Sequence, residues 1–337
     1  MLVLGIETSC DECSVAVVED GRDIRGMVIA TQDEIHAPYS GVVPELASRR
    51  HIETIYPVYR ETLDQAGVRS EEIALVAVTV QPGLAGSLAV GVAFAKALAL
   101  GLGCPLVGVD HIPAHLYAIQ LETTVDYPFL GLVISGGHTL IARVPAPGSL
   151  EVMGTTIDDA CGEAFDKIAK HLELGYPGGV VIDRLARQGD PGAFSFPVPS
   201  LHKGDHRYDL SYSGLKTAVV NQLEQFRNPG FVATPENIAA GFEKAAIDMA
   251  FNRLRRAQRE TGMNRVVVAG GVAANSYLRQ RLESWAGVEV HVPSRRLCTD
   301  NGAMIAGLGY HLFRERGGDD LDLDILPKVA AFRGNYP

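Results

Sequence analysis

The sequence lacks the features of a secreted or disulfide-held protein. Only five of its 337 residues are cysteines: Cys10, Cys13, Cys104, Cys161 and Cys298. An odd and scattered set of this kind does not form a disulfide framework, which indicates a reducing cytoplasm. The first residues carry no basic leader, and Glu7 interrupts the first apolar run, so we expect no signal peptide and a cytoplasmic location.

The sequence also lacks an excess of positive charge. Its formal net charge is −10, which gives no general attraction to nucleic acid or to an anionic membrane. A polyanionic partner would need a local basic patch or the surface of another protein. Arg253, Arg255, Arg256 and Arg259 form a basic stretch, but such a run is usually a solvated helix face.

No long apolar run suits a membrane helix, and no second cysteine pair suits a zinc knuckle. Residues 84–109 are the most apolar zone, yet Lys96 and Pro105 favour a buried helix followed by a strand. We therefore expect no membrane association. Cys10 and Cys13 have C-x-x-C spacing, but without a second pair this spacing gives little support to a metal or redox role.

The length and the hydrophobic content of the chain predict a large globular protein. Hydrophobic residues make up 47% of the chain, which is long enough for two domains. Glycine is enriched, because 36 of the 337 residues are glycines and the usual share is ~7% of residues. Adjacent glycines indicate loops whose backbone approaches a ligand closely.

The apolar pattern predicts a β-β-β-α-β-α order that occurs twice. In the first copy we expect strands at 2–6, 14–18, 24–30, 73–80 and 106–109, with helices at 44–66 and 86–100 and another from His111. In the second copy we expect strands at 129–135, 139–144, 150–156, 265–269 and 288–292, with helices at 160–172, 214–226, 235–261, 275–286 and 302–316. Residues 175–213 show few strong elements. Two such halves predict a two-lobed α/β protein with a central cleft.

The segment Asp110-His111-Ile112-Pro113-Ala114-His115 predicts a metal site. Asp110 is a good helix N-cap, and Pro113 is tolerated in the first turn. His111 and His115 would then lie one turn apart on the same face, at the carboxyl end of a buried strand, where α/β sheets place ligands. Asp300, at the start of the last long helix, is the best distant third ligand.

The same spacing has two other interpretations. A pair of histidines at i and i+4 is often just two surface residues, and the preceding strand is what favours a metal here. Zinc peptidases of the H-E-x-x-H type use a Glu after the first His, but Ile112 occupies that position, so we exclude a peptidase.

Three glycine loops suggest an anionic ligand. They are Ser135-Gly136-Gly137-His138-Thr139, Tyr176-Pro177-Gly178-Gly179 and Ala269-Gly270-Gly271-Val272-Ala273-Ala274-Asn275. Backbone N–H groups at such loops and at helix N-termini converge on phosphate oxygens. Any one pair of glycines is more often an ordinary turn, so the prediction depends on the three together.

The chain resembles the tRNA N(6)-adenosine threonylcarbamoyltransferase family from residue 1 to about 316. The motifs that carry the resemblance are Gly5-Ile6-Glu7-Thr8-Ser9-Cys10-Asp11-Glu12, Gly41-Val42-Val43-Pro44-Glu45-Leu46-Ala47-Ser48-Arg49, the His111/His115 pair, Ser135-Gly136-Gly137-His138-Thr139, Gly162-Glu163-Ala164-Phe165-Asp166-Lys167, Ser211-Tyr212-Ser213-Gly214-Leu215-Lys216-Thr217, Gly270-Gly271-Val272 and Cys298-Thr299-Asp300-Asn301-Gly302-Ala303-Met304.

The resemblance implies an actin-like ATPase fold, also called the sugar kinase/Hsp70 fold, with two ribonuclease H-like lobes. We expect the N-terminal lobe at 1–121 plus 302–337, and the C-terminal lobe at 122–301 with a helical insertion at about 175–262. The implied reaction moves a threonylcarbamoyl group from threonylcarbamoyl-adenylate to the N(6) amine of the adenosine beside the anticodon, in tRNAs that read codons starting with A. AMP is released.

Site roles follow from the same resemblance. His111, His115 and Asp300 would hold one divalent metal, iron in the family, with zinc as the alternative. The substrate or nucleotide residues would be Val133, Ile134, Ser135, Gly136, Gly137, Asp166, Gly179, Asp183 and Asn275. Glu12, which follows the first strand, is the proposed catalytic base, although a solvated loop acid is the simpler interpretation.

The chain departs from the family pattern at one position, and several alternative functions are considered. Some members have a Tyr metal contact just before the Ser-Gly-Gly; here Leu132-Val133-Ile134 occupies that stretch, so water or a substrate oxygen would complete the shell. Alternative functions are an O-carbamoyltransferase for a small molecule, a non-catalytic scaffold paralogue and a sugar-kinase-like phosphotransferase. The expected partners are tRNA, a paralogous protein of actin-like fold and a small ATPase.

Overall fold

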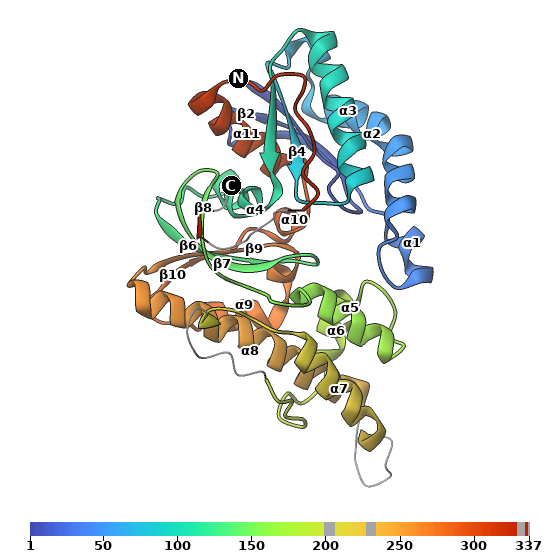
Figure 1. The fold of residues 1–337 in the computed structure, drawn as a ribbon, viewed down its shortest axis with the longest axis vertical. Helices are drawn as coiled ribbons and strands as arrows, with labels where there is room; N and C mark the ends of the chain where they lie inside the picture. The colour runs from blue at the N-terminus through green and yellow to red at the C-terminus, as the bar shows by residue number, and fades with distance from the viewer. Residues whose placement is uncertain (199–205, 227–233, 329–333, 336–337) are drawn as a thin grey trace. The chain divides into compact units, whose positions relative to one another are not determined.

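A computed structural model describes residues 1–198, 206–226, 234–328 and 334–335 (Figure 1). The chain divides into two compact units. Unit 1 comprises Met1–Tyr127, Val144–Leu150 and Arg296–Ala331, and unit 2 comprises Pro128–Arg143, Glu151–Arg295 and Phe332–Pro337. Parts of the predicted insertion (199–205 and 227–233) and of the predicted N-terminal lobe (329–333 and 336–337) lie outside the described residues.

Unit 1 is built on a mixed five-stranded sheet with the order β3-β2-β1-β4-β5. β1 pairs antiparallel with β2, and parallel with β4, which pairs parallel with β5. The strands are β1 (Leu2–Glu7), β2 (Cys13–Glu19), β3 (Asp23–Ala30), β4 (Leu75–Gln81) and β5 (Leu106–Asp110).

The sheet of unit 1 is covered on both faces, because successive side chains of a strand point to opposite sides. Val3 packs into a cluster with residues of α11, whereas its neighbour Leu4 packs with residues of α2 and α3. The helices of unit 1 and its boundary are α1 (Asp33–His36), α2 (Pro44–Ala66), α3 (Ala85–Leu102), α4 (His111–Tyr117), α10 (Arg295–Cys298) and α11 (Gly302–Arg316), with 3-10 turns at Ala37–Tyr39, Ser70–Glu72 and Ala118–Leu121.

Gly5 explains how closely α11 approaches the sheet. A Cβ atom at Gly5 would lie 2.1 Å from the carbonyl oxygen of Gly302 and 2.5 Å from the backbone nitrogen of Ala306. The backbones of β1 and α11 therefore touch directly, and α11 begins against the centre of the sheet. This contact places the residue before its N-cap, Asp300, beside the end of β1.

Unit 2 repeats the strand order of unit 1. Its sheet has the order β10-β9-β6-β7-β8-β11, with β6 parallel to β9 and β9 parallel to β10. The strands are β6 (Phe129–Ile134), β7 (Thr139–Ala146), β8 (Ser149–Thr155), β9 (Arg265–Ala269), β10 (Glu289–His291) and β11 (Gly334–Asn335). The order β8-β7-β6-β9-β10 matches β3-β2-β1-β4-β5, which confirms the repeat predicted from the sequence.

The helices of unit 2 include one that the apolar pattern missed. They are α5 (Cys161–His171), α6 (Gly178–Ala186), α7 (Ser213–Phe226), α8 (Pro235–Thr261) and α9 (Ser276–Glu283), with a 3-10 turn at Gly271–Ala274. The expectation of few strong elements after Gly175 was wrong for α6. Its two N-terminal glycines indicated a turn, but α6 packs against α5 and α8 and buries Ile182, and this tertiary packing offsets its low helix propensity.

α3 is long and apolar enough to cross a membrane by length and composition alone. Buried helices of soluble proteins pass the same test, and 33% of its 18 residues are buried. It packs on β4 and α2 of unit 1.

Candidate functional site

The predicted metal-binding helix forms as expected. β5 ends at Asp110, whose side chain caps α4 by accepting a hydrogen bond of 2.9 Å from the Ile112 amide. The other carboxylate oxygen of Asp110 accepts a 2.7 Å bond from Gln81 on the neighbouring strand. α4 is only seven residues long, but all seven are buried, so packing and the cap hold His111 and His115 in place.

Asp300 joins the two histidines, and all three belong to unit 1. Oδ1 of Asp300 lies 3.1 Å from Nε2 of His115 and 3.6 Å from Nε2 of His111. The two Nε2 atoms are 3.1 Å apart. Asn301 caps α11 by accepting a 3.0 Å bond from the Met304 amide, and this fixes the backbone next to Asp300. One ligand atom from each residue lies within 4.8 Å of the others, close enough to hold one metal ion.

The electrostatics of this cluster favour a positive charge between the three groups. Burial would lower the pKa of His111, but Asp300 and Glu7 raise it to about 9. Burial and the nearby His111 lower the pKa of His115, which favours its neutral, ligating form. A divalent metal would supply the positive charge that the carboxylates of Asp300 and Glu7 favour. The donor set of two imidazoles and one carboxylate therefore fits a metal such as iron or zinc.

Sequence reasoning gave no role to Glu7, which is fully buried at the end of β1. Its Oε2 lies 3.0 Å from Nδ1 of His111. Burial would raise the pKa of Glu7, but the charge and hydrogen bond of His111 lower it overall. One feature of the sequence could have indicated this role: Glu7 is a carboxylate in an otherwise apolar strand. A buried charge needs a partner, so a nearby cation or hydrogen-bond donor was to be expected.

Glu12 lies in the loop between β1 and β2 and is half-buried. Burial, the neighbouring Asp11 and the negative charge of Asp300 raise its pKa well above the usual value for a glutamate. A metal ion on Asp300 would reduce that last contribution. Glu12 therefore lies within electrostatic reach of the candidate metal centre, in the same unit.

The cysteines of the same loop are poorly suited to metal or redox chemistry. Cys10 and Cys13 are both free thiols. Burial raises the pKa of Cys13 to about 11 and that of Cys10 well above its usual value. Because the thiolate is the reactive form, these shifts agree with the small role expected from the C-x-x-C spacing.

The first glycine loop of unit 2 follows β6. Backbone amides at the start of α5 donate to this loop, from Gly162 to the Ser135 carbonyl (3.1 Å) and from Glu163 to the Gly136 carbonyl (3.1 Å). Gly136 and Gly137 are exposed, with open space where a Cβ atom would point. The side chains of Val133 and Ile134 are fully buried, so only their backbone is available to a ligand at this strand end.

The other predicted nucleotide residues gather around α6 and α9. Asp166 accepts a 2.7 Å bond from the Gly178 amide at the start of α6. Gly179, next to it, has open space at its Cβ position. Asp183 accepts a 2.7 Å bond from the Ser276 amide at the start of α9. These contacts connect Asp166, Gly179 and Asp183 in one region of unit 2.

Asn275 completes this region and reveals a second residue missed from the sequence. Its Oδ1 caps α9 by accepting from the Leu278 amide (2.9 Å), and its Nδ2 donates to the buried Glu243 of α8 (2.6 Å). Burial raises the pKa of Glu243 to about 7, and Asp183 adds to the rise although the Asn275 bond opposes it.

Glu243→Gln is expected to stabilise the ligand-free protein at pH 8 by about 1–3 kcal/mol. The folded protein holds the Glu243 proton up to about pH 7, whereas the unfolded chain releases it near the ordinary glutamate pKa of 4.5. Wild-type stability should therefore fall as the pH rises between these values, and glutamine should remove that fall. The advantage should shrink towards pH 5.

Urea unfolding of both proteins across this pH range measures the effect. The exposed Glu283→Gln serves as the matched control and should change stability by less than about 0.5 kcal/mol at either pH. An advantage of Glu243→Gln that stays constant from pH 5 to pH 8 would contradict the expectation.

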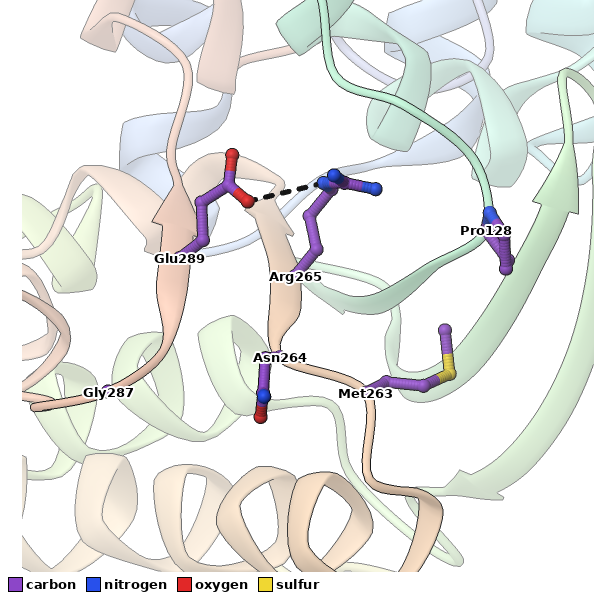
Figure 2. Close-up of a pocket in the computed structure, with 6 residues that line it drawn as sticks. All are labelled: Pro128, Met263, Asn264, Arg265, Gly287 and Glu289. Atoms are coloured by element: carbon purple, nitrogen blue, oxygen red, sulfur yellow. Dashed lines mark hydrogen bonds and ion pairs between the residues drawn. The ribbon is translucent and has the colours of Figure 1, made fainter.

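One hollow of about 360 Å³ lies elsewhere in unit 2 (Figure 2). Pro128 precedes β6, Arg265 begins β9 and Glu289 begins β10, so the hollow lies at the amino ends of three neighbouring strands. The ion pair of Arg265 and Glu289, with an N–O distance of 3.3 Å, borders it. Parallel sheets place ligands at the carboxyl ends of their strands, so this hollow is not the catalytic pocket.

The basic stretch of α8 is only partly engaged in contacts inside the protein, since Arg255 and Arg259 are exposed. Arg253 is buried and donates a 3.0 Å bond to the Asp209 carbonyl, and Arg256 pairs with Glu260 at 2.7 Å. Arg255 lies over the Phe251 ring. Two of the four side chains are therefore committed to ion pairs or backbone contacts.

Comparisons with known proteins give a consistent result. The profile of the family described as tRNA N6-adenosine threonylcarbamoyltransferase matches residues 23–307. A protein of that name from Treponema denticola is 51% identical over 98% of both chains. Another from Borrelia garinii subsp. bavariensis is 47% identical over 100% of this chain and 99% of its own.

Among solved structures, the likeness is one of fold. HypF of T. kodakarensis has a TM-score of 0.62 at 16% identity, covering 93% of this chain and 48% of its own. The ROK hexokinase from Thermus thermophilus has a TM-score of 0.50 at 13% identity, covering 94% of this chain and 100% of its own. These neighbours agree with the two-lobed α/β fold expected from the sequence.

Proposed function

The chain belongs to the tRNA N6-adenosine threonylcarbamoyltransferase family, and from that membership we propose how its residues carry out the transfer. It is a transferase that modifies tRNA. The finer proposal is that the donor is threonylcarbamoyl-adenylate and the acceptor is the N6 amine of the adenosine beside the anticodon in tRNAs that read codons starting with A. Full-length similarity to named relatives is the observation that carries this assignment.

We assign the adenylate part of the donor to unit 2. The exposed Gly136 and Gly137 of the Ser135-Gly136-Gly137 loop leave space for an anionic group, and adjacent backbone amides suit phosphate oxygens. The carboxylates of Asp166 and Asp183 suit ribose hydroxyls. Asn275 and Gly179 lie in the same region, and the backbone of Val133 and Ile134 ends the strand beside it.

His111, His115 and Asp300 would hold one divalent metal, for which we propose iron, with zinc as the alternative. When bound, the metal supplies Lewis acidity at the carbamoyl carbonyl. In the transfer itself, the N6 nitrogen forms a bond to the carbamoyl carbon, and the bond from that carbon to the phosphate oxygen breaks to release AMP. We propose that Glu12 accepts the proton that the amine loses, because a pKa raised above the usual glutamate value makes its carboxylate a stronger base.

The alternatives have less support. A small-molecule O-carbamoyltransferase is not favoured, since the relatives with high identity are named as tRNA enzymes. The kinase-like neighbours share only the fold, at 13% identity for the hexokinase. The converged ligand cluster argues against a non-catalytic scaffold.

For partners, tRNA follows from the function. We further propose a paralogous protein of actin-like fold and a small ATPase as helpers, and a cytoplasmic location. The net charge of −10 supports a need for helpers, because it opposes the approach of a polyanion.

The reaction products test the transferase assignment. With purified threonylcarbamoyl-adenylate, tRNA and the helper proteins, AMP should appear in step with modified adenosine, because the anhydride bond to AMP is the one that breaks. Nucleotide chromatography and mass spectrometry of digested tRNA measure the two products. An omission of tRNA is the control, and it should lower AMP release to the rate of donor hydrolysis.

A different stoichiometry would overturn the assignment. If this chain alone phosphorylated an acceptor and formed ADP from ATP in proportion to product, it would be a phosphotransferase.

A further inference from the structure

Glu7 is a buried carboxylate whose two oxygens both accept hydrogen bonds. Thr79 Oγ1 on β4 donates to Oε2 at 2.7 Å, and the Ser9 amide donates to Oε1 at 2.5 Å. The side chain has no exposed surface. Neighbouring groups therefore hold this carboxylate in one position, out of contact with solvent.

The third contact of Glu7 determines which nitrogen of His111 carries a proton. Oε2 lies 3.0 Å from Nδ1 of His111, and an ionised carboxylate can only accept. Nδ1 must then carry the hydrogen, which leaves the lone pair of a neutral ring on Nε2. That same Nε2 atom faces His115 and Asp300. The hydroxyl of Ser9 lies 3.3 Å from Nδ1 as a longer, second contact.

We propose that Glu7 is the positioning residue of the metal centre: it holds His111 with Nδ1 protonated and Nε2 directed at the metal. This inference depends on the metal centre in the proposed function. Histidine ligands commonly donate their second N–H to a carboxylate, which fixes the ring and increases its basicity. Glu7 acts through His111 and does not touch the reacting atoms.

The other histidine makes Glu7 more important. Among the described residues, Nδ1 of His115 is buried and has no hydrogen-bond partner. His115 is therefore held by the packing of α4 and by its contacts through Nε2. The cluster has one anchored imidazole, so a change at Glu7 is not compensated at His115.

Glu7→Gln tests the proposal with nearly the same side-chain volume. Glutamine has one accepting oxygen, whereas both oxygens of Glu7 accept, so its NH2 group must face a donor in either orientation. We expect the dissociation constant for Zn²⁺ to rise about 10- to 100-fold. Competition with a chromophoric chelator measures it, and the absorption spectrum of the Co²⁺-loaded protein reports the change in ligand geometry.

Asp209→Asn is the matched control. Oδ2 of Asp209 lies 2.7 Å from Nδ1 of His206, and Oδ1 accepts from the Thr155 amide, so a buried carboxylate again supports a histidine, but in unit 2. Its Zn²⁺ affinity should stay within about twofold of wild type. Unchanged Zn²⁺ affinity in folded Glu7→Gln protein would overturn the proposal.

A measurement on the wild-type protein covers the case in which Glu7→Gln does not fold. In ¹⁵N NMR spectra of Zn²⁺-loaded protein, His111 should show a protonated Nδ1 and a zinc-bound Nε2. Zinc bound to Nδ1 would overturn the role of Glu7. Zn²⁺ affinity that survives His111→Ala/His115→Ala would instead overturn the metal centre itself, so the two failures are distinguishable.

Discussion

A protein carrying both His111→Ala and His115→Ala is expected to lose its bound metal and its transfer activity together. The two imidazoles supply two of the three ligand atoms, and Asp300 alone is a weak site for a transition metal. Activity should fall to the background of the uncatalysed reaction. The buried positions of both rings make some loss of stability unavoidable, so folding must be measured in parallel.

Elemental analysis of the purified protein and the tRNA modification assay together measure this result. His311→Ala is the matched control, because His311 is a partly buried histidine of unit 1 that contacts Tyr117 (2.8 Å) and not the metal cluster. It should retain metal and most activity. Full activity in a verified metal-free double variant would show that the metal is not part of the chemistry.

Glu12→Gln is expected to lower kcat by about 10²- to 10⁴-fold while changing KM much less. Glutamine keeps the shape of the side chain but cannot accept the proton of the N6 amine. The pH dependence of activity provides a second test of Glu12. Since the pKa of Glu12 is raised, wild-type activity should rise with pH as this carboxyl ionises, and that rise should be absent in Glu12→Gln.

Asp11→Asn is the control for the pH profile. The negative charge of Asp11 raises the pKa of Glu12, so its removal should shift the rise in activity to lower pH with little loss of the maximum. Steady-state rates at saturating tRNA from pH 5 to pH 9 measure both profiles. A Glu12→Gln enzyme with wild-type kcat would exclude Glu12 as the base and leave it as a loop acid.

Local patterns in the sequence predicted much of the site. The N-cap at Asp110, the i, i+4 pair of histidines and the repeated strand order are features of contiguous residues, and the structure contains all three. The pairing of Asp300 with α4 depended on where the last helix packs. The predicted repeat suggested that the last helix returns to the first half of the chain. The close approach of α11 to Gly5 places the helix there.

The residues that the sequence could not assign act through contacts between distant segments. Glu7 meets a ring 104 positions further along the chain, and Glu243 meets an amide 32 positions away. Both look like ordinary glutamates in a strand and in a long helix. α6 was missed for a related reason, since its glycines suit a turn and only its packing partners stabilise the helix.

The position of Asp300 has a consequence for the order of events during synthesis. Two of the three proposed ligands, and the carboxylate proposed to support them, are made within the first 115 residues of 337, but the third proposed ligand follows 185 residues later. A nascent chain that has released only its first half offers an incomplete site with two donors. Capture of the proposed ion would therefore come near the end of translation, and the ion would connect α4 to the segment that precedes α11. Because all three ligands come together only in the folded full-length chain, the binding free energy of the proposed ion would stabilise that chain and not truncated products.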